Sequence, residues 1–391
     1  MKSVGKPQKN KKLTGASIQP RRGLLVGKPT DAPFLILVLL LLGTGLICMF
    51  SASYATAYYD QDNPLFYIIR QAAFAGAGLV AMYFVSFINY QKLHHFAIPL
   101  LIVSVVLMAL VFTPLGVVRN EARRWLNLGF TQFQPSEIVK FAVILAFSSF
   151  ATKLGEKMHT FKYGILPFLG ILGVFILMLK EQPHLSAAII IGGTGLILIF
   201  VAGANMAWLV GMGSLGVVGA VAFVFTNEYA MERIHVWFDP FIDPLDKGWQ
   251  GVQSFIAIGS GGFWGLGLGQ SRQKHLYLPE PANDFIFSVI CEELGFFGAM
   301  IIILVFAALI VRGFWIAMRA PDKFGCLLVT GIVTQIAIQT IVNMCVVCGL
   351  MPITGASLPF FSYGGTSLTI LLAEVGVVLA VARQIPAAKS G

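Results

Sequence analysis

Long apolar runs alternate with short polar breaks along most of this 391-residue chain. A helix that spans a bilayer needs about 20 apolar residues, and ten stretches come close to that length. Backbone polar groups at membrane depth must be satisfied internally, and no alternating strand pattern occurs, so each stretch predicts a helix. The predicted spans are approximately 34–53, 66–88, 96–115, 134–151, 163–180, 184–203, 205–226, 284–312, 323–348 and 363–385.

Composition supports the same fold class. Hydrophobic residues make up 57% of the chain and charged residues only 12%. A soluble protein of this length could not bury so much apolar surface, which indicates that lipid is the solvent. We therefore expect an all-α polytopic membrane protein with about ten transmembrane helices.

The basic residues predict the orientation. Residues 1–32 carry eight Lys or Arg and little apolar content, which predicts a disordered cytoplasmic tail. Ten spans would place the short tail 387–391 in the cytoplasm too, and this topology puts 17 of the 27 Lys and Arg inside. The net charge of +9 then reflects orientation and the anionic inner leaflet, not nucleic acid. A signal peptide cleaved near "SASYATA" is the alternative, but the apolar run before it is long for one.

Residues 33–386 are predicted to form one membrane domain, in which most connections are short. The exception is 227–283, a large extracellular loop of 57 residues between spans seven and eight. Its stretch "VQSFIAIGSGGFWGLGLG" is moderately apolar and interrupted by glycines. We expect this stretch to lie at the interface or re-enter the bilayer. A further full span would move the later loops to the opposite side of the membrane, against their charge bias.

Three arginines lie on the external side, against the orientation rule. Arg119, Arg123 and Arg124 follow the third span, so we expect them to have an anionic partner at headgroup level. The planar guanidinium suits phosphate because it can donate two hydrogen bonds. Local pairing with Glu121, or contact with generic lipid phosphate, is the alternative.

Further polar groups enter the predicted spans from the same side. Glu137 and Lys140 are three residues apart and share a helical face, either to fix the helix or to line a polar cavity. Prolines and glycines in 343–369 forbid a long regular helix there, and such a segment survives at membrane depth only when protein or a wet cavity covers it. A single outward-facing cavity for an anionic, hydrogen-bonding ligand would account for all of these breaks.

Four motifs carry a resemblance to a known family. They are "GLICMFSAS", "ARRWLNLGFTQFQPSEIVK", "GSGGFWGLGLGQSRQKHLYLPEPANDFIFSVICEELG" and "GLMPITGASLPFFSYGGTS". In this order, in a chain of ten predicted spans, they resemble the SEDS family, which includes FtsW and RodA. The likeness runs from about residue 31 to 385 and is closer to the FtsW division and sporulation branch.

The resemblance implies a peptidoglycan glycosyltransferase that polymerises lipid II into glycan strands at the outer face of the bacterial cytoplasmic membrane. Implied partners are a class B penicillin-binding transpeptidase, divisome proteins, lipid-linked glycan and membrane lipid. No cofactor is certain, although a divalent cation such as Mg²⁺ or Mn²⁺ fits a pyrophosphate substrate. The implied catalytic residue is Asp284. The expected substrate-binding residues are Arg123, Arg124, Glu137, Lys140, Lys274, Ser362, Thr366 and Ser367.

Other interpretations stay open. Asp284 could be only the N-cap of the eighth span. Glu292 and Glu293 follow eight and nine residues later, about 12–14 Å deeper along a helix, so we expect them to be structural or cavity-lining. His184 stands where the family commonly has an acid, and Glu374 is not a usual family feature. The whole protein could instead be a lipid II flippase, which also uses polar groups within the membrane, or a scaffold.

Overall fold

The computed structural model describes residues 30–386 apart from 120–121, 128, 130–131 and 227. The predicted tails 1–32 and 387–391 therefore lie almost wholly outside the described residues. The long helices are α1 (Ala32–Gln61), α2 (Phe66–Val85), α3 (Ala97–Leu110), α4 (Pro135–Leu154), α5 (Leu166–Glu181), α6 (Leu185–Val201), α7 (Met206–Thr226), α8 (Glu228–Phe238), α9 (Trp249–Gly261), α10 (Ile286–Met318), α11 (Lys323–Val347) and α12 (Gly365–Ala382).

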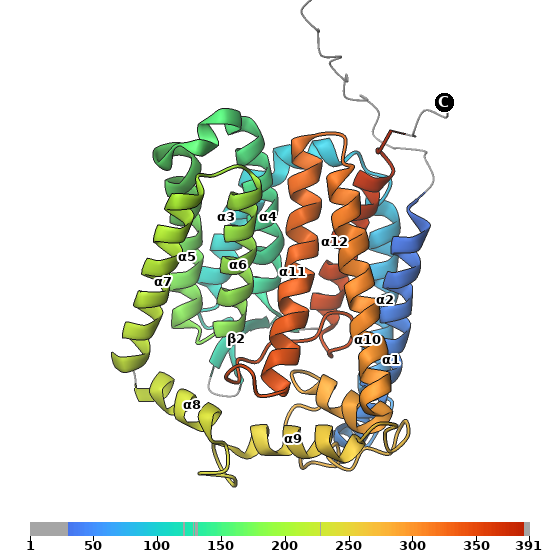
Figure 1. Cartoon of the computed structure of the whole chain (residues 1–391). Coiled ribbons are helices and arrows are strands. Elements are labelled where there is room, and N and C mark those ends of the chain that lie inside the picture. The colour runs from blue at the N-terminus through green and yellow to red at the C-terminus, as the bar shows by residue number, and fades with distance from the viewer. Residues whose placement is uncertain (1–29, 120–121, 128, 130–131, 227, 387–391) are drawn as a thin grey trace, which may run out of the picture.

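Apolar helices form one upright bundle (Figure 1). Within the described residues, eight helical stretches are long and apolar enough to cross a membrane, and α6 is a shorter apolar helix of 17 residues. Each of the ten predicted spans coincides with a helix, which confirms the helical fold of a multi-pass membrane protein.

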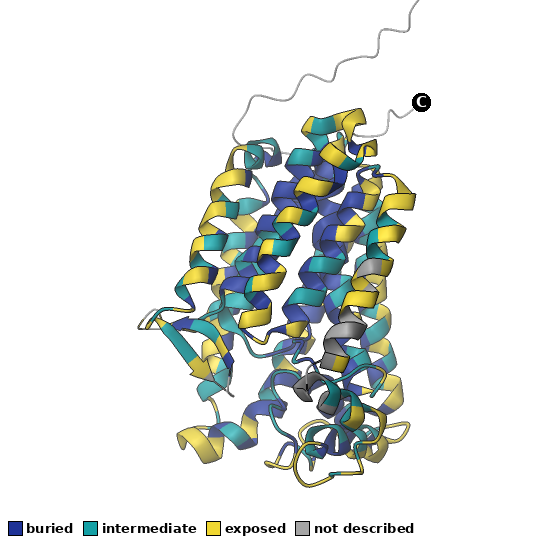
Figure 2. Cartoon of the chain, turned by 90° about the vertical axis from the view of Figure 1, so that its left-hand side faces the viewer, coloured by how far each residue is buried: buried dark blue, intermediate teal, exposed yellow. Residues whose placement is uncertain are grey.

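Burial divides the bundle into a centre and a periphery (Figure 2). In α11, 78% of the most apolar stretch is buried, against 17% in the stretch Tyr90–Leu110 that ends in α3. Peripheral helices expose large side chains such as Phe84, Leu177 and Ile301. That outward apolar surface is expected where the surrounding solvent is hydrocarbon.

The two ends of the described chain lie at the same end of the bundle (Figure 1). Asp31 caps α1 by accepting from the Phe34 N–H at 3.1 Å, and Pro33 stands in the first turn, where a missing N–H costs nothing. The same carboxylate pairs with Arg312 near the end of α10, at 2.7 Å. This contact fastens the start of the first helix to the end of the predicted eighth span.

A small antiparallel sheet is an addition to the predicted all-helical fold. It consists of β1 (Gly116–Arg119), β2 (Ala122–Asn127) and β3 (Gln132–Phe133), in the order β1-β2-β3. The sheet lies at the opposite end from the described chain ends (Figure 1). The sequence predicted only a basic loop here, because two short strands paired over a turn leave little periodic pattern.

The predicted loop 227–283 contains two helices, α8 and α9, between α7 and α10. The helix α9 lies across the end of the bundle rather than along it (Figure 1). Its 13 residues are too few to cross a bilayer, and it buries Val252 and Ala257.

The segment after α9 packs on a break in α10. Gly295 has φ 66° and ψ −170°, which interrupts the helix and frees its neighbouring backbone groups. The N–H groups of Leu266 and Gly267 donate to the carbonyls of Glu292 and Glu293, each at 2.9 Å. A Cβ at Gly295 would lie 2.3 Å from the Gly265 nitrogen, so only glycine permits this docking. The break thereby fixes the segment that leads toward Asp284.

Candidate active site

A cavity of about 1220 Å³ enters the bundle at the end that carries the sheet. Its walls come from α2, β2, α4, the start of α6, the segment before α10, α11 and the 355–371 region. Among the residues predicted from the sequence, the cavity is lined by Asp284, Arg124, Glu137, Lys140, Ser362, Thr366 and Ser367. The described lining does not include Arg123 or Lys274.

Asp284 is held at the cavity by α11 and by the segment that follows it. The Asn343 side chain donates to the Asp284 carbonyl at 2.8 Å and to the Ala356 carbonyl at 2.6 Å. Ser362 donates to the Asn283 carbonyl at 2.7 Å. A Cβ at Gly355, whose φ is +74°, would stand 3.3 Å from the Asp284 carboxylate. The carboxylate therefore rests against bare backbone beside the cavity.

The N-cap position of α10, the alternative role left open for Asp284, is occupied by its neighbour. α10 begins at Ile286, and its N-cap residue is Phe285, which has no side-chain oxygen. Because an Asp cap must sit at that position to accept from the first turn, Asp284 is one residue too early.

Glu137 and Lys140 form the predicted ion pair, with 2.9 Å between nitrogen and oxygen. Both are buried, and α4 starts at Pro135, which places the pair in its first two turns. Ser367 donates to Glu137 at 2.6 Å, and Lys140 donates to Gln339 at 3.1 Å. Buried charges need such additional bonds, so the pair ties α4, α11 and α12 together at the cavity wall.

The neighbouring arginines separate because successive strand residues point to opposite faces. Arg124 lines the cavity and donates through Nε to the Gln182 carbonyl at 3.2 Å and through Nη2 to the Pro183 carbonyl. Arg123 instead donates to the Phe112 carbonyl at 3.4 Å, outside the described lining. The described cavity lining thus includes Arg124 but not Arg123, where the sequence predicted both.

A further cation of the cavity lining, Arg70, was not predicted. Arg70 lies in the first two turns of α2, lines the cavity, and places its guanidinium 4.2 Å from the centre of the Phe66 ring. Arg70 falls within the predicted apolar span 66–88. Its position near a span end was the available clue, since arginine inside a membrane helix commonly marks a functional site or a headgroup contact.

His184 also belongs to the cavity, between α5 and α6. Its ring nitrogens lie 3.4 and 3.5 Å from the Gln134 amide nitrogen. Burial, together with the charges of Arg124 and Lys140, lowers the pKa of His184 to about 3. The imidazole is therefore neutral at physiological pH and offers hydrogen bonds without charge.

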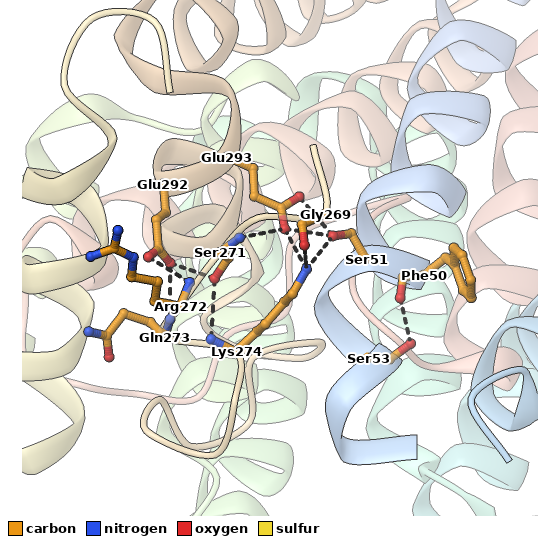
Figure 3. A network of polar contacts seen from close by, with 10 residues as sticks. All are labelled: Phe50, Ser51, Ser53, Gly269, Ser271, Arg272, Gln273, Lys274, Glu292 and Glu293. Carbon is orange, nitrogen blue, oxygen red and sulfur yellow. Dashed lines mark hydrogen bonds and ion pairs between the residues drawn. The ribbon is translucent and has the colours of Figure 1, made fainter. Parts of the chain in front are cut away.

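Lys274 has a different environment from the one predicted. Its ammonium donates to Glu293 at 2.8 Å, to Ser51 at 3.0 Å and to the Gly269 carbonyl at 2.7 Å (Figure 3). Those contacts use all three ammonium hydrogens in a buried network outside the described cavity lining. Lys274 thus lies in an internal ion pair, where the sequence predicted a substrate-binding side chain.

Glu292 and Glu293 complete this network. Glu292 accepts from the Ser271 hydroxyl and from the backbone N–H groups of Arg272 and Gln273, at 2.9 and 3.3 Å for the two backbone bonds (Figure 3). Neither glutamate lines the described cavity. Of the two interpretations left open for them, the structure favours the structural one.

Three more lining residues were not predicted. Gln335 and Gln339 lie one turn apart on α11, and Glu374 lies in the middle of α12. Gln335 donates to Glu374 at 2.8 Å, and Gln339 donates to the Ser357 carbonyl at 3.0 Å. Glutamines within apolar runs do not by themselves indicate a cavity, since neutral amides are common in buried helix contacts.

The sequence was compared with known families and proteins. Residues 32–386 match the family model FTSW_RODA_SPOVE, described as cell cycle protein. Stage V sporulation protein E of Bacillus subtilis is 43% identical over 354 residues, which cover 90% of this chain and 97% of that protein. A probable peptidoglycan glycosyltransferase FtsW of Geobacter sp. is 38% identical over 356 residues, with coverages of 91% and 97%.

Solved structures that resemble this chain belong to proteins of peptidoglycan synthesis and rod shape determination. One solved chain comes from a structure described as "Structural coordination of polymerization and crosslinking by a peptidoglycan synthase complex". It has a TM-score of 0.76 and 29% sequence identity to this chain, and the match covers 91% of this chain and 98% of that one. The rod shape determining protein RodA of Thermus thermophilus has a TM-score of 0.67 at 28% identity, with coverages of 91% and 97%. With its membrane fold and these matches over nearly its whole length, the chain belongs to the FtsW, RodA and SpoVE family.

Proposed function

We propose that this protein is a peptidoglycan glycosyltransferase that polymerises lipid II at the outer face of the cytoplasmic membrane, for cell division or sporulation. The observation that carries the proposal is the single cavity in which Asp284, Arg124 and the Glu137–Lys140 pair meet. Relatives that match about 90% of this chain are named "Probable peptidoglycan glycosyltransferase FtsW". A cavity with an acid, cations and hydroxyls suits a lipid-linked sugar pyrophosphate.

In the proposed reaction, Asp284 is the general base. It takes the proton from the 4-hydroxyl of the lipid II GlcNAc as that oxygen bonds to the anomeric carbon of the growing chain. The bond from this carbon to the pyrophosphate breaks, and its electron pair leaves with the pyrophosphate. The proton ends on the Asp284 carboxylate and passes to water before the next cycle.

Positive charge must stabilise the departing pyrophosphate. Arg124 and Arg70 are the cations that we assign to it, because both line the cavity on elements at the sheet end. Arg124 is held by the turn at 182–183, so its guanidinium is positioned before the substrate arrives. Ser362, Thr366 and Ser367 supply further neutral groups to the same wall.

A divalent cation, Mg²⁺ or Mn²⁺, is also part of the proposal. The described residues contain no group of three or more His, Cys, Asp or Glu side chains arranged to hold a metal. Mg²⁺ commonly binds one or two carboxylates together with substrate phosphates, so Asp284 and the pyrophosphate fit as its ligands. A bound cation would add positive charge at the leaving group.

The proposal extends to partners and placement. A class B penicillin-binding transpeptidase would crosslink the strands, as the similarity to a chain of a peptidoglycan synthase complex supports. We place both chain termini in the cytoplasm and the cavity mouth outside, with divisome proteins as further partners. The basic residues 1–32 support this orientation through the positive-inside rule.

The test is to incubate purified protein with labelled lipid II, with and without its transpeptidase, and to separate the products by size. We expect glycan strands in the presence of the active pair, and their loss on chelation if the cation is required. Movement of lipid II between leaflets of proteoliposomes, with no glycan product, would instead support the flippase. A scaffold would leave cell division or sporulation intact in Asp284→Asn and Arg124→Gln strains that keep normal protein levels.

A further inference from the structure

One stripe of α12 runs down the cavity wall and ends at a carboxylate. Ser367, Leu371 and Glu374 line the cavity at helical spacing, so they share one face of the helix. Glu374 is seven positions after Ser367, which places the glutamate about 10 Å further along the axis. The cavity therefore reaches from the sheet end of the bundle to mid-helix depth.

Glu374 and Gln335 meet at this inner end. The Gln335 amide nitrogen donates to Glu374 Oε2 at 2.8 Å, and the two residues are only 3% and 2% exposed. In the described structure, Glu374 Oε1 and Gln335 Oε1 are both buried without a hydrogen-bond partner. Unsatisfied buried acceptors are costly, and both belong to residues that line the cavity. The pair thus keeps two buried, unpaired acceptor oxygens in side chains at the inner end of the cavity.

The two ends of the cavity differ in polarity. Arg70 and Arg124 lie at the sheet end, where α2 begins and β2 runs. At the inner end, the Lys140 ammonium is bonded to Glu137 and Gln339, so its charge is already matched. A phosphate has only acceptor oxygens and negative charge, which favours the arginine end and disfavours Glu374. A polyprenyl tail has no donors to offer at either end.

We propose that Glu374 and Gln335 form an inner subsite that accepts hydrogen bonds from hydroxyl or amide N–H groups of a saccharide. The assignment rests on the proposed function, because it names the part of the lipid-linked substrate that enters furthest. Sugars carry several donors within the reach of two adjacent acceptors, and such a site rejects ligands that lack them. The substrate is thereby oriented with its pyrophosphate at the arginines and its sugar toward Glu374.

Binding measurements can test this separately from catalysis. The full-length protein in nanodiscs, carrying Asp284→Asn to block the proposed chemistry, is titrated with lipid II and with the same polyprenyl pyrophosphate lacking sugars. Glu374→Leu keeps similar volume and removes the acceptors, while Glu374→Gln keeps one carbonyl oxygen. Thr334→Val is the matched control, because Thr334 also buries an unpartnered oxygen on α11 but does not line the described cavity.

We expect Glu374→Leu to weaken lipid II binding about tenfold, the loss of one good hydrogen bond, and to leave binding of the sugar-free pyrophosphate unchanged. Glu374→Gln should recover part of the affinity, and Thr334→Val should match the parent. Unchanged lipid II affinity in Glu374→Leu, or an equal loss for both ligands, would overturn the subsite. Absence of glycan strands from the parent protein would refute the proposed function instead, whatever the binding result.

Discussion

Among the described residues, two buried lysine–glutamate ion pairs have almost the same nitrogen–oxygen distance but very different surroundings. Lys274 and Glu293 lie 2.8 Å apart, and Lys140 and Glu137 lie 2.9 Å apart. The first pair is enclosed by Ser51, Gly269 and Ser271 and stays outside the described cavity lining (Figure 3). The second pair forms part of the cavity wall.

Hydrogen-bond satisfaction distinguishes the two regions better than charge does. Every ammonium hydrogen of Lys274 has an acceptor, and Glu292 and Glu293 take donors from the chain between Ser271 and Lys274. In the cavity wall that also contains Lys140, by contrast, Gln335 and Glu374 each keep a buried acceptor oxygen without a hydrogen-bond partner. A closed network fixes a segment in place, whereas open polar groups leave bonds for a ligand.

Breaking the closed network should have the largest effect. Lys274→Met leaves Glu293 buried without its cation, which we expect to cost about 3–5 kcal/mol of stability. Thermal unfolding in detergent should show a lower midpoint, and activity should fall in proportion to the folded fraction. A Lys274→Met protein of parental stability that binds lipid pyrophosphate poorly would contradict the structural role and restore a substrate contact.

Breaking the Glu137–Lys140 pair in the cavity wall should reduce activity more than it reduces stability. Lys140→Met removes a bond to Gln339 and so loosens the wall that faces the substrate, for which we expect polymerisation to fall about 100-fold. The midpoint should drop less than in Lys274→Met, because water in the cavity can solvate Glu137. Equal destabilisation in the two variants would show that the cavity does not relieve the buried charge.

The two neighbouring arginines offer a matched pair. Arg124→Gln removes a cavity cation and its bonds to the turn at 182–183, so we expect about a tenfold lower polymerisation rate. Arg123→Gln alters the other face of the same strand and should change the rate less than twofold. Initial rates at saturating lipid II would measure both, and the reverse order of effects would contradict the assignment of faces.

The smallest expected effect is a pH dependence from His184. Its folded pKa of about 3 lies below the ordinary 6.5, so the unfolded chain binds more protons between those values. Stability from this group is complete above pH 6.5 and declines as the pH falls, by about 1.4 kcal/mol at pH 5.5. His184→Gln should lose that share of the pH dependence in thermal unfolding, and identical profiles for the two proteins would exclude the buried neutral imidazole.

Much of the fold could be predicted because it depends on local pattern. Apolar runs gave the positions of the helices, and polar breaks indicated where side chains such as Glu137 and Asp284 meet. The buried environment of Lys274 could not be predicted, because its hydrogen bond to Ser51 joins residues 223 positions apart in the sequence. Spacing says nothing about such contacts, which depend on the docking of one segment on the Gly295 break.

Asp284 is the residue on which the account depends most, and its amide variant tests it directly. Initial rates of glycan formation from purified lipid II should be compared for the parent, Asp284→Asn and Asp62→Asn, with unfolding midpoints for each. Asp62 is an exposed acid after α1 in a left-handed conformation that Asn tolerates, and it does not line the described cavity. We predict a loss of about 10²–10⁴-fold for Asp284→Asn at an unchanged midpoint, and parental rates for Asp62→Asn. A folded Asp284→Asn protein that polymerises lipid II at the parental rate would contradict the account.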